Sequence, residues 1–202
     1  MKFTTGRLTI RPFQIEDVND VHEYCAQSGV GESAGWPTHE SMQQTSQILV
    51  GWIKTGYKHA IIWRGNGKVI GHIAIDPDSE ENRSDTRELG CALNRDYQRR
   101  GVMTEVIKAT VDYLFQNGIE YVWACCFQSN IPSRKMIEKC GFIFQQEGTY
   151  YSEGLHRTLP SYEYRLSKNE WNKRKRTPTN RNFTKCSLNS QTIDNGGKRN
   201  NG

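Results

Sequence analysis

The stretch of residues 88–118 constrains the fold most, because its hydrophobic pattern changes period within a few residues. Residues 88–93 have the pattern of a strand. After the Gln98-Arg99-Arg100-Gly101 segment, a helical pattern follows that ends at Gly118, with apolar residues at Met103, Val106, Ile107, Val111, Leu114 and Phe115. A strand, a short loop and a long helix in this order indicate an α/β domain.

The start of this helix offers a binding site for phosphate groups. The first turn of a helix has backbone N–H groups without partners, and the helix dipole adds about half a positive charge there. Gly101 lets the backbone approach a pyrophosphate closely, while Arg99, Arg100 and Thr104 supply charge or a hydroxyl. An ordinary helix start with two solvated arginines explains the same residues equally well.

The rest of the chain supplies further strands and helices. Leu8 to Pro12 alternates as a half-buried strand does, and the Gly65-Asn66-Gly67 turn joins strands 59–64 and 69–75 in a hairpin. The other predicted helices cover residues 16–26, 41–54 and 131–140, and the other strands cover 121–126, 141–147 and 162–166. The order β-α-α-β-β-β-α-β-α-β-β predicts one mixed, twisted sheet with helices on both faces.

Charge is unevenly distributed along the 202 residues. The chain has 27 basic and 22 acidic residues, a net charge of +5. Residues 168–202 hold nine basic and two acidic residues, which leaves a net charge of −2 for residues 1–167, so the folded part is not a basic nucleic-acid binder. We expect residues 1–168 to form the domain and residues 169–202, which have few apolar side chains, to form a basic, disordered tail.

Several other classes of protein are excluded. The amino-terminal residues lack the apolar stretch of a secretory signal, and the longest charge-free apolar run, residues 48–53, is too short to span a bilayer. The six cysteines form no Cys-x-x-Cys pair and no His-x-x-x-His occurs, so zinc and thioredoxin-like sites lack their spacing. The sequence therefore predicts a cytoplasmic protein with reduced cysteines, no metal and no membrane partner.

Three segments, in the right order, carry a resemblance to a known family. The Gln98-Arg99-Arg100-Gly101-Val102-Met103 segment resembles the Gln/Arg-x-x-Gly-x-Gly/Ala acetyl-CoA loop of the GNAT acetyltransferase superfamily. Asn130-Ile131-Pro132-Ser133 with Lys139-Cys140-Gly141-Phe142 resembles its second motif, and residues 7–13 with Gly35-Trp36-Pro37 resemble its branch of Rim-type ribosomal-protein alanine N-acetyltransferases. The resemblance covers residues 3 to about 168. It implies a single mixed, twisted and splayed sheet flanked by helices on both faces.

The resemblance implies a transfer of acetyl from acetyl-CoA to a primary amine. The acceptor is then either the N-terminal α-amine of a ribosomal protein or a small amine such as a polyamine, an amino sugar or an antibiotic. The rival from another class is a non-catalytic acyl-CoA-binding or RNA-associated module, tethered to ribosomal RNA through the basic tail, in which Lys173 to Arg176 resemble a nucleic-acid-binding arm. A solvated charge run explains those four residues too.

The same resemblance assigns roles to single residues. It implies that acetyl-CoA contacts Leu93, Gln98, Arg99, Arg100, Gly101, Val102, Met103, Thr104 and Asn130. Glu88 stands at the position of the general base, and a backbone N–H near Leu93 stands at the position of the oxyanion donor. Ser133 stands at the position of the group that protonates the departing thiolate. Glu88 is alternatively a surface carboxylate, and Ser133 and Asn130 are alternatively helix caps.

The sequence departs from the family pattern at two positions. Met103 stands where the loop has its last glycine or alanine, and Ile137 stands where many members have a tyrosine that protonates the thiolate. Glu153 and Trp36 are loosely placed candidates for the acceptor pocket. The five histidines are scattered, so surface or packing roles are expected for each.

Overall fold

The computed structural model describes residues 1–77 and 83–176. The strands are β1 (Phe3–Thr4), β2 (Leu8–Pro12), β3 (Lys58–Trp63), β4 (Val69–Pro77), β5 (Thr86–Leu93), β6 (Tyr121–Phe127), β7 (Ile143–Ser152) and β8 (Arg157–Ser167). The α-helices are α1 (Val18–Cys25), α2 (Met42–Thr55), α3 (Val102–Gln116), α4 (Ile131–Cys140) and α5 (Lys168–Arg176). Short 3₁₀ turns cover Ile15–Asp17, Glu32–Ala34 and Arg95–Tyr97.

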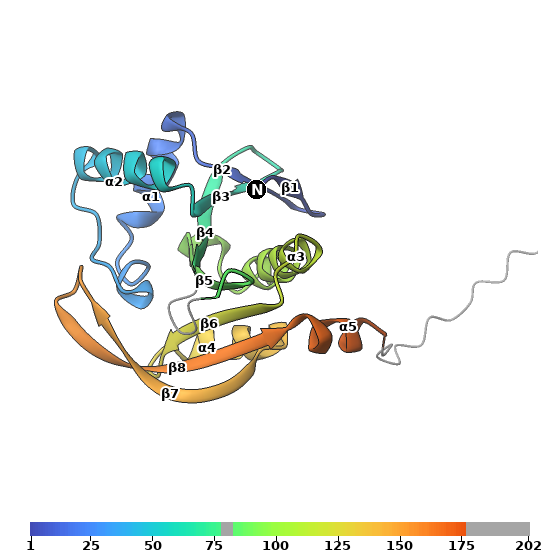
Figure 1. Cartoon of the computed structure of the whole chain (residues 1–202). Coiled ribbons are helices and arrows are strands. Elements are labelled where there is room, and N and C mark those ends of the chain that lie inside the picture. The colour runs from blue at the N-terminus through green and yellow to red at the C-terminus, as the bar shows by residue number, and fades with distance from the viewer. Residues whose placement is uncertain (78–82, 177–202) are drawn as a thin grey trace, which may run out of the picture.

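Within the described residues, the eight strands form one sheet in the order β1-β2-β3-β4-β5-β6-β8-β7 (Figure 1). Of these pairs β5–β6 is parallel, and the remaining ones are antiparallel. A parallel pair needs a crossover connection, and α3 provides it between β5 and β6. The predicted fold class, one mixed and splayed sheet with helices on both faces, is confirmed.

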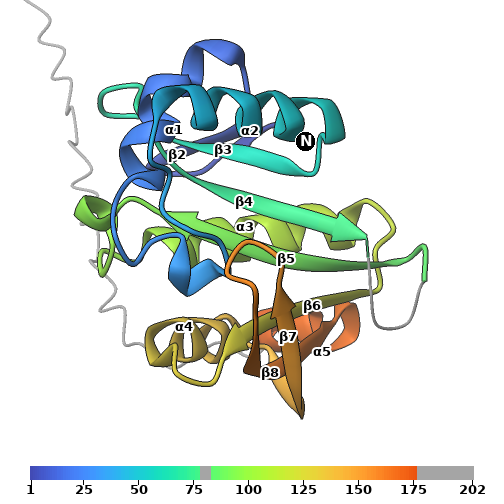
Figure 2. The ribbon, with the colours of Figure 1, turned by 90° about the vertical axis from the view of Figure 1, so that its left-hand side faces the viewer.

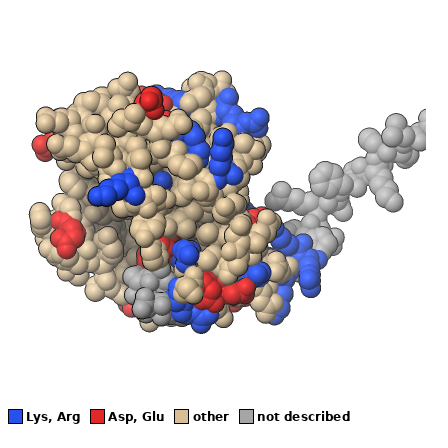
Figure 3. Space-filling model, turned by 45° about the horizontal axis from the view of Figure 1, so that its top comes forward, with Lys and Arg blue, Asp and Glu red and all other residues tan. Residues whose placement is uncertain are grey.

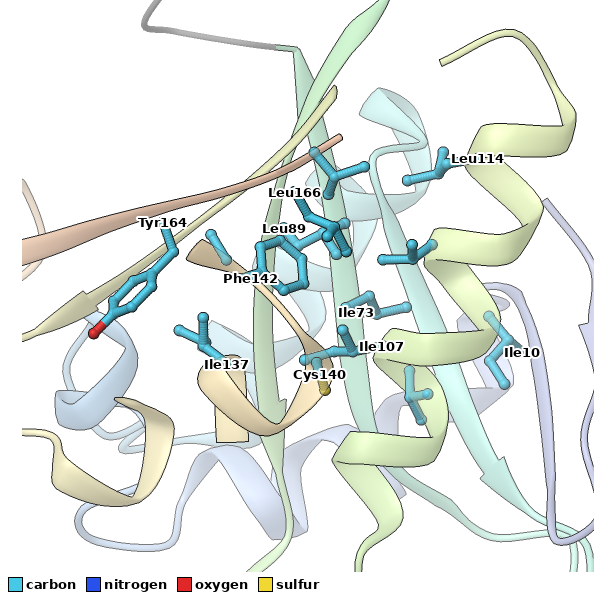
Figure 4. Packing of buried hydrophobic residues seen from close by; sticks show 14 of the residues in the cluster. Ile10, Ile73, Leu89, Ile107, Leu114, Ile137, Cys140, Phe142, Tyr164 and Leu166 are labelled. Atoms are coloured by element: carbon cyan, nitrogen blue, oxygen red, sulfur yellow. The ribbon is translucent and has the colours of Figure 1, made fainter. Parts of the chain in front are cut away.

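The two faces of the sheet bury separate hydrophobic clusters. On one face, α3 and α4 pack onto the sheet through residues such as Ile107, Leu114 and Ile137, together with Leu89 and Leu166 from the strands (Figure 4). On the other face, α1 and α2 cover a second cluster of ten buried residues: Phe13, Val21, Tyr24, Cys25, Val30, Leu49, Ala60, Ile62, Val69 and Ala92. Both faces of β4 are therefore buried, which fixes its position at the centre.

The helices begin and end where the sequence places capping residues. The Ser41 hydroxyl accepts a hydrogen bond from the Gln44 N–H at 3.2 Å, which satisfies one donor at the start of α2. Gly141, at φ 99°, ends α4 in the left-handed conformation that glycine adopts at low cost. In the part of the chain that is described, none of the helices is long and apolar enough to cross a membrane.

The β7–β8 hairpin is longer than the sequence predicted. The expected strands were 141–147 and 162–166, whereas pairing runs from Ile143↔Arg165 to Ser152↔Arg157. Almost all of β7 is solvent-exposed, so no alternation of apolar and polar residues marks its extent. The turn of this hairpin reaches across to the segment before α2 (Figures 1 and 2), where the Ser152 hydroxyl donates to the Gly35 carbonyl at 2.5 Å.

The predicted tail is wrong over its first residues. Residues 169–176 belong to α5, because the Trp171 side chain is 7% exposed within the α3–α4 cluster and its Nε1–H donates to Asp112 at 2.6 Å. The buried Trp171 ring anchors this otherwise polar helix to the domain, and the ion pair between Lys175 and Asp112 adds to the attachment. Basic side chains of α5 gather beside the start of the grey trace (Figure 3). Residues 177–202 lie outside the described residues.

Replacing Trp171 with alanine should destabilise the domain by about 3 kcal/mol, since it removes a buried aromatic side chain and its hydrogen bond to Asp112. Thermal unfolding measures the change. Deleting residues 177–202 is the control and should leave the melting temperature unchanged. An equal melting temperature for Trp171→Ala and the intact chain would show that α5 does not support the fold.

Candidate active site

The strands β5 and β6 separate halfway along their length. Their parallel pairing runs from Thr86↔Tyr121 to Leu89↔Ala124 and stops there, although both strands continue. Beyond that point β5 still pairs with β4 up to Leu93, and β6 still pairs with β8 up to Phe127. Each strand therefore keeps one neighbour, and a wedge-shaped gap opens in the middle of the sheet.

The backbone of β5 presents hydrogen-bond donors to this gap. The Asn94 N–H donates to the Ile70 carbonyl of β4 at 2.8 Å. Backbone groups alternate in direction along a strand, so the N–H groups of Cys91 and Leu93 point to the opposite side, toward the gap. These donors are placed where a carbonyl oxygen inserted between the strands would meet them.

A cavity of about 980 Å³ occupies the gap and extends to both faces of the sheet. Its walls come from β4, β5 and β6, from the starts of α3 and α4, and from the segments around Gly35 and Glu153. A volume of this size accommodates a large co-substrate and a second molecule. In residues 1–77 and 83–176, no group of three His, Cys, Asp or Glu side chains could hold a metal ion.

The loop before α3 forms one end of the cavity. Gly101 has φ 72° and Arg99 has φ 58°, so the chain turns sharply twice before the helix. The first helical hydrogen bond runs from the Glu105 N–H to the Gly101 carbonyl, which leaves the amides of the first turn without partners inside the helix. The Gln98 amide braces the loop by donating to the Leu93 carbonyl at 2.9 Å. An anion of the size of a pyrophosphate fits this geometry.

The amino-terminal strand region holds the loop in place. Arg7 makes an ion pair with Glu105 of α3 at 2.7 Å and donates to the Arg100 carbonyl at 3.1 Å. Hydrogen bonding to Arg7 and Thr5 lowers the pKa of Glu105, against the effect of burial, which is the largest contribution and raises it. The carboxylate therefore stays ionised and keeps the start of α3 fixed against β2.

Eight of the nine residues predicted to contact acetyl-CoA line the cavity: Leu93, Gln98, Arg99, Gly101, Val102, Met103, Thr104 and Asn130. Arg100 is not among the lining residues. Its guanidinium lies over the Tyr97 ring, 5.7 Å from the centroid, so its side-chain charge is directed elsewhere. A cation–π contact with a neighbouring ring competed with the expected phosphate contact, and the sequence pattern does not distinguish the two.

The start of α4 forms the opposite wall. Asn130 is the cap of this helix, since its Oδ1 accepts from the Ser133 N–H at 3.1 Å, and its Nδ2 donates to the Ser33 carbonyl at 3.1 Å. The Ser133 hydroxyl does not cap the helix. It lines the cavity and has no hydrogen-bond partner among the described residues.

Carboxylates line the cavity on the side of the sheet that carries α1 and α2. Glu88 of β5 lies directly opposite Asp76 of β4, and Glu153 comes from the β7–β8 turn. Burial raises the pKa of Asp76, against the opposing charge of Lys58. Burial and the nearby charge of Glu88 raise the pKa of the Tyr150 hydroxyl, which also faces the cavity. Sequence reasoning missed Asp76 and Tyr150, because the pairing of β4 with β5, which sets Asp76 opposite Glu88, joins residues distant in the sequence.

One of the five histidines, His72, lines the cavity and is packed in the protein interior. His72 is 3% exposed, and its Nδ1 is 3.0 Å from the Tyr24 hydroxyl. Burial, reinforced by the charge of Lys58, lowers the pKa of His72 to about 3, so the ring is neutral at pH 7. Trp36 packs near it, with a ring-centroid distance of 6.5 Å, and walls the same side of the cavity.

The family is shown by comparison with known proteins. The family model described as "Acetyltransferase (GNAT) domain" matches residues 7–143. The chain therefore belongs to the GNAT acetyltransferase family, and it is an acyltransferase that uses the acetyl-CoA chemistry of that family.

Single relatives agree with this assignment. The "Uncharacterized N-acetyltransferase YnaD" of Bacillus subtilis is 29% identical over 178 residues, which cover 85% of this chain and 100% of that protein. The structure of a GNAT-family acetyltransferase from Bacillus anthracis has a TM-score of 0.72 and 24% identity, covering 83% of this chain and 98% of that one.

Two further solved structures share the fold at lower identity. A ribosomal-protein-S5-alanine acetyltransferase from Vibrio fischeri has a TM-score of 0.66 and 17% identity, covering 85% of this chain and 98% of that one. The microcin C7 self-immunity acetyltransferase MccE, solved with acetyl-CoA and AMP, has a TM-score of 0.68 and 14% identity, covering 81% and 93%. At these identities the likeness concerns the fold.

Replacing Gly101 with glutamate should abolish acetyl-CoA binding, because a carboxylate would stand among the amides that are expected to bind the pyrophosphate. Gly101→Ala is the matched control. A Cβ at this position would meet only Arg7 at 3.9 Å, so alanine adds backbone strain but no charge and little bulk. Calorimetric titration with acetyl-CoA measures both variants. Unchanged affinity in Gly101→Glu would place the co-substrate elsewhere.

Proposed function

We propose that the protein transfers the acetyl group of acetyl-CoA to a primary amine that binds in the carboxylate-lined part of the cavity. The observation that carries this proposal is the juxtaposition of three features. The unpaired amides at the start of α3, the N–H groups of β5 that face the gap, and Glu88 all border one cavity. Together they supply a binding site for the pyrophosphate anion, a hydrogen-bond donor to the oxyanion and a general base.

The residues present fit acetyl-CoA. The first turn of α3 would hold the pyrophosphate, and the gap between β5 and β6 would receive the extended arm that carries the thioester. The N–H of Leu93 or Cys91 would then donate to the thioester oxygen and stabilise the negative charge that develops on it. Acetyl-CoA brings the activated acetyl group; the chain supplies position and electrostatics.

Transfer would be direct, from thioester to amine. Burial raises the pKa of the Cys91 thiol to about 12 and that of the Cys126 thiol to about 11, so these cavity thiols stay protonated at pH 7 and are poor nucleophiles. The amine nitrogen would attack the carbonyl carbon, the new N–C bond would form, and the C–S bond would break to release the thiolate.

Glu88 would accept the proton that the amine gives up. A lysine-type amine, with a pKa of about 10.4, must lose a proton at a cost of about 4.6 kcal/mol at pH 7, whereas an α-amino group near 7.7–8.0 requires much less. A half-buried carboxylate in the cavity wall can take this proton directly or through water. The proton on the thiolate would come from Ser133, whose hydroxyl lines the opposite wall.

Two classes of acceptor amine are supported by different observations. A protein N-terminal α-amine is supported by the sequence resemblance to Rim-type enzymes, and a small amine is supported by the carboxylates around the acceptor end. A panel of amines that includes a peptide beginning with alanine, with free thiol release as the readout, separates these acceptors and the non-catalytic alternative. The cytoplasmic location and the contact with ribosomal RNA stay predictions.

Replacing Glu88 with glutamine should lower kcat at pH 7 about a hundredfold, while the Kd for acetyl-CoA changes little. The loss should shrink as the pH rises toward the pKa of the acceptor, because a neutral amine needs no base. Steady-state rates between pH 7 and pH 10 measure this convergence. Wild-type turnover at pH 7 in the variant would remove Glu88 from the mechanism.

Replacing Ser133 with alanine should slow thiol release about tenfold, if the hydroxyl protonates the thiolate or orients a water that does. The melting temperature should change little, since Asn130 caps α4 and the Ser133 hydroxyl does not. Asn130→Ala is the matched control, and it should lower the melting temperature. A Ser133→Ala variant with wild-type turnover would strike the residue from the site.

A further inference from the structure

Two carboxylates lie directly opposite each other in the acceptor part of the cavity. Asp76 and Glu88 are paired across β4 and β5, and both line the cavity. Residues paired in this way have neighbouring Cβ atoms, and like charges placed so close destabilise a sheet. The proposed mechanism uses Glu88 as the base and leaves Asp76 without a task.

Asp76 has no cationic partner within the described residues. The cation that influences its pKa is Lys58, but the Lys58 ammonium lies over the Trp52 ring, 5.6 Å from the centroid, and makes no ion pair with Asp76 in residues 1–77 and 83–176. Burial raises the pKa of Asp76. Lys58 also lines the cavity but does not pair with Asp76, so a cation that enters the cavity is the group best placed to pair with this half-buried carboxylate.

The remaining walls also suit a cation. The rings of Phe127 and Tyr150 lie 5.9 Å apart at the cavity wall, and Trp36 lines it from the segment before α2. Aromatic faces attract ammonium groups and pack against methylene chains. Glu153 adds a third carboxylate from the β7–β8 turn.

Two loop segments meet over the carboxylate-lined part of the cavity, called the acceptor end here, and narrow it. The Ser152 hydroxyl donates to the Gly35 carbonyl at 2.5 Å, and a Cβ on Gly154 would lie 2.7 Å from the Pro37 ring. The β7–β8 turn and the Gly35–Pro37 segment are therefore in direct contact over the acceptor end (Figure 2). A compact molecule fits such a chamber better than a polypeptide, which must leave it as an extended chain.

We propose that the acceptor is a small amine that carries a second positive charge, and that Asp76, assisted by Glu153, binds this second ammonium while Glu88 serves the reacting amine. This inference rests on the proposed acetyl transfer and specifies its acceptor. Asp76 is then a specificity-determining residue, which binds the substrate at a group that does not react.

A matched pair of acceptors tests the proposal. 1,4-Diaminobutane and n-pentylamine have similar length and differ in whether the far end is an ammonium or a methyl group. The ratio of their kcat/KM values is compared between the wild type and Asp76→Asn, so that the different basicities of the two amines cancel. We expect the ratio to fall about tenfold or more in Asp76→Asn, which corresponds to about 1.4 kcal/mol or more.

Three controls make the result specific. Glu147→Gln removes an exposed carboxylate of β7 outside the cavity and should leave the ratio unchanged. Asp76→Glu keeps the negative charge, so its ratio of kcat/KM values for the two amines should be closer to the wild-type ratio than that of Asp76→Asn. The melting temperature and the acetyl-CoA affinity of each variant show whether the fold and the co-substrate site are intact.

Two outcomes would overturn the inference while leaving the proposed function standing. One is an equal ratio in the wild type and Asp76→Asn; the other is a peptide beginning with alanine that is acetylated faster than every diamine. An absence of thiol release with all amines of the panel would refute the proposed function itself, and this inference with it.

Discussion

The separation of β5 from β6 is the feature on which the rest of the site depends. Buried backbone groups without partners are costly, so two strands part inside a sheet only where something else holds them. Here β4 holds the outer edge of β5 and β8 holds the outer edge of β6. The N–H groups of Cys91 and Leu93 on the inner edge of β5 then remain available to a ligand.

The same separation divides the site into two halves with different chemistry. On the side of α3 and α4, the cavity offers unpaired amides and the positive end of a helix dipole, which suit an anion. On the side of α1 and α2 it offers Asp76, Glu88 and Glu153, which suit a cation. An anionic co-substrate and a cationic acceptor would thus approach from opposite sides and meet in the gap, with little competition for each other's site.

The sequence predicted the parts of the structure that follow from local patterns. The helix after Gly101, the hairpin at Gly65–Gly67 and the bounds of α4 follow from hydrophobic period, turn chemistry and capping, which act over a few residues. Eight of the nine residues predicted to contact acetyl-CoA likewise line the cavity. The side chain of Arg100 lies over the Tyr97 ring, a contact that the local pattern does not reveal.

The features that the sequence did not predict depend on contacts between distant residues. The extent of β7 is set by pairing with β8 and not by burial, and α5 forms because Trp171 reaches Asp112 on α3. Asp76 belongs to the same class. Its importance comes from the residue opposite it and from the cavity in front of it, and neither is visible in the residues around position 76.

Ile137 stands where many family members have a tyrosine. The side chain is 2% exposed and packs in the core with Phe142 and Tyr164 (Figure 4). A hydroxyl on that side chain would need a partner in an apolar environment. Ser133 lies four residues earlier on α4, hence on the same face of the helix, and both residues line the cavity. If Ser133 protonates the thiolate as proposed, the donor stands one turn away from the tyrosine position of other members, and position 137 can be fully apolar.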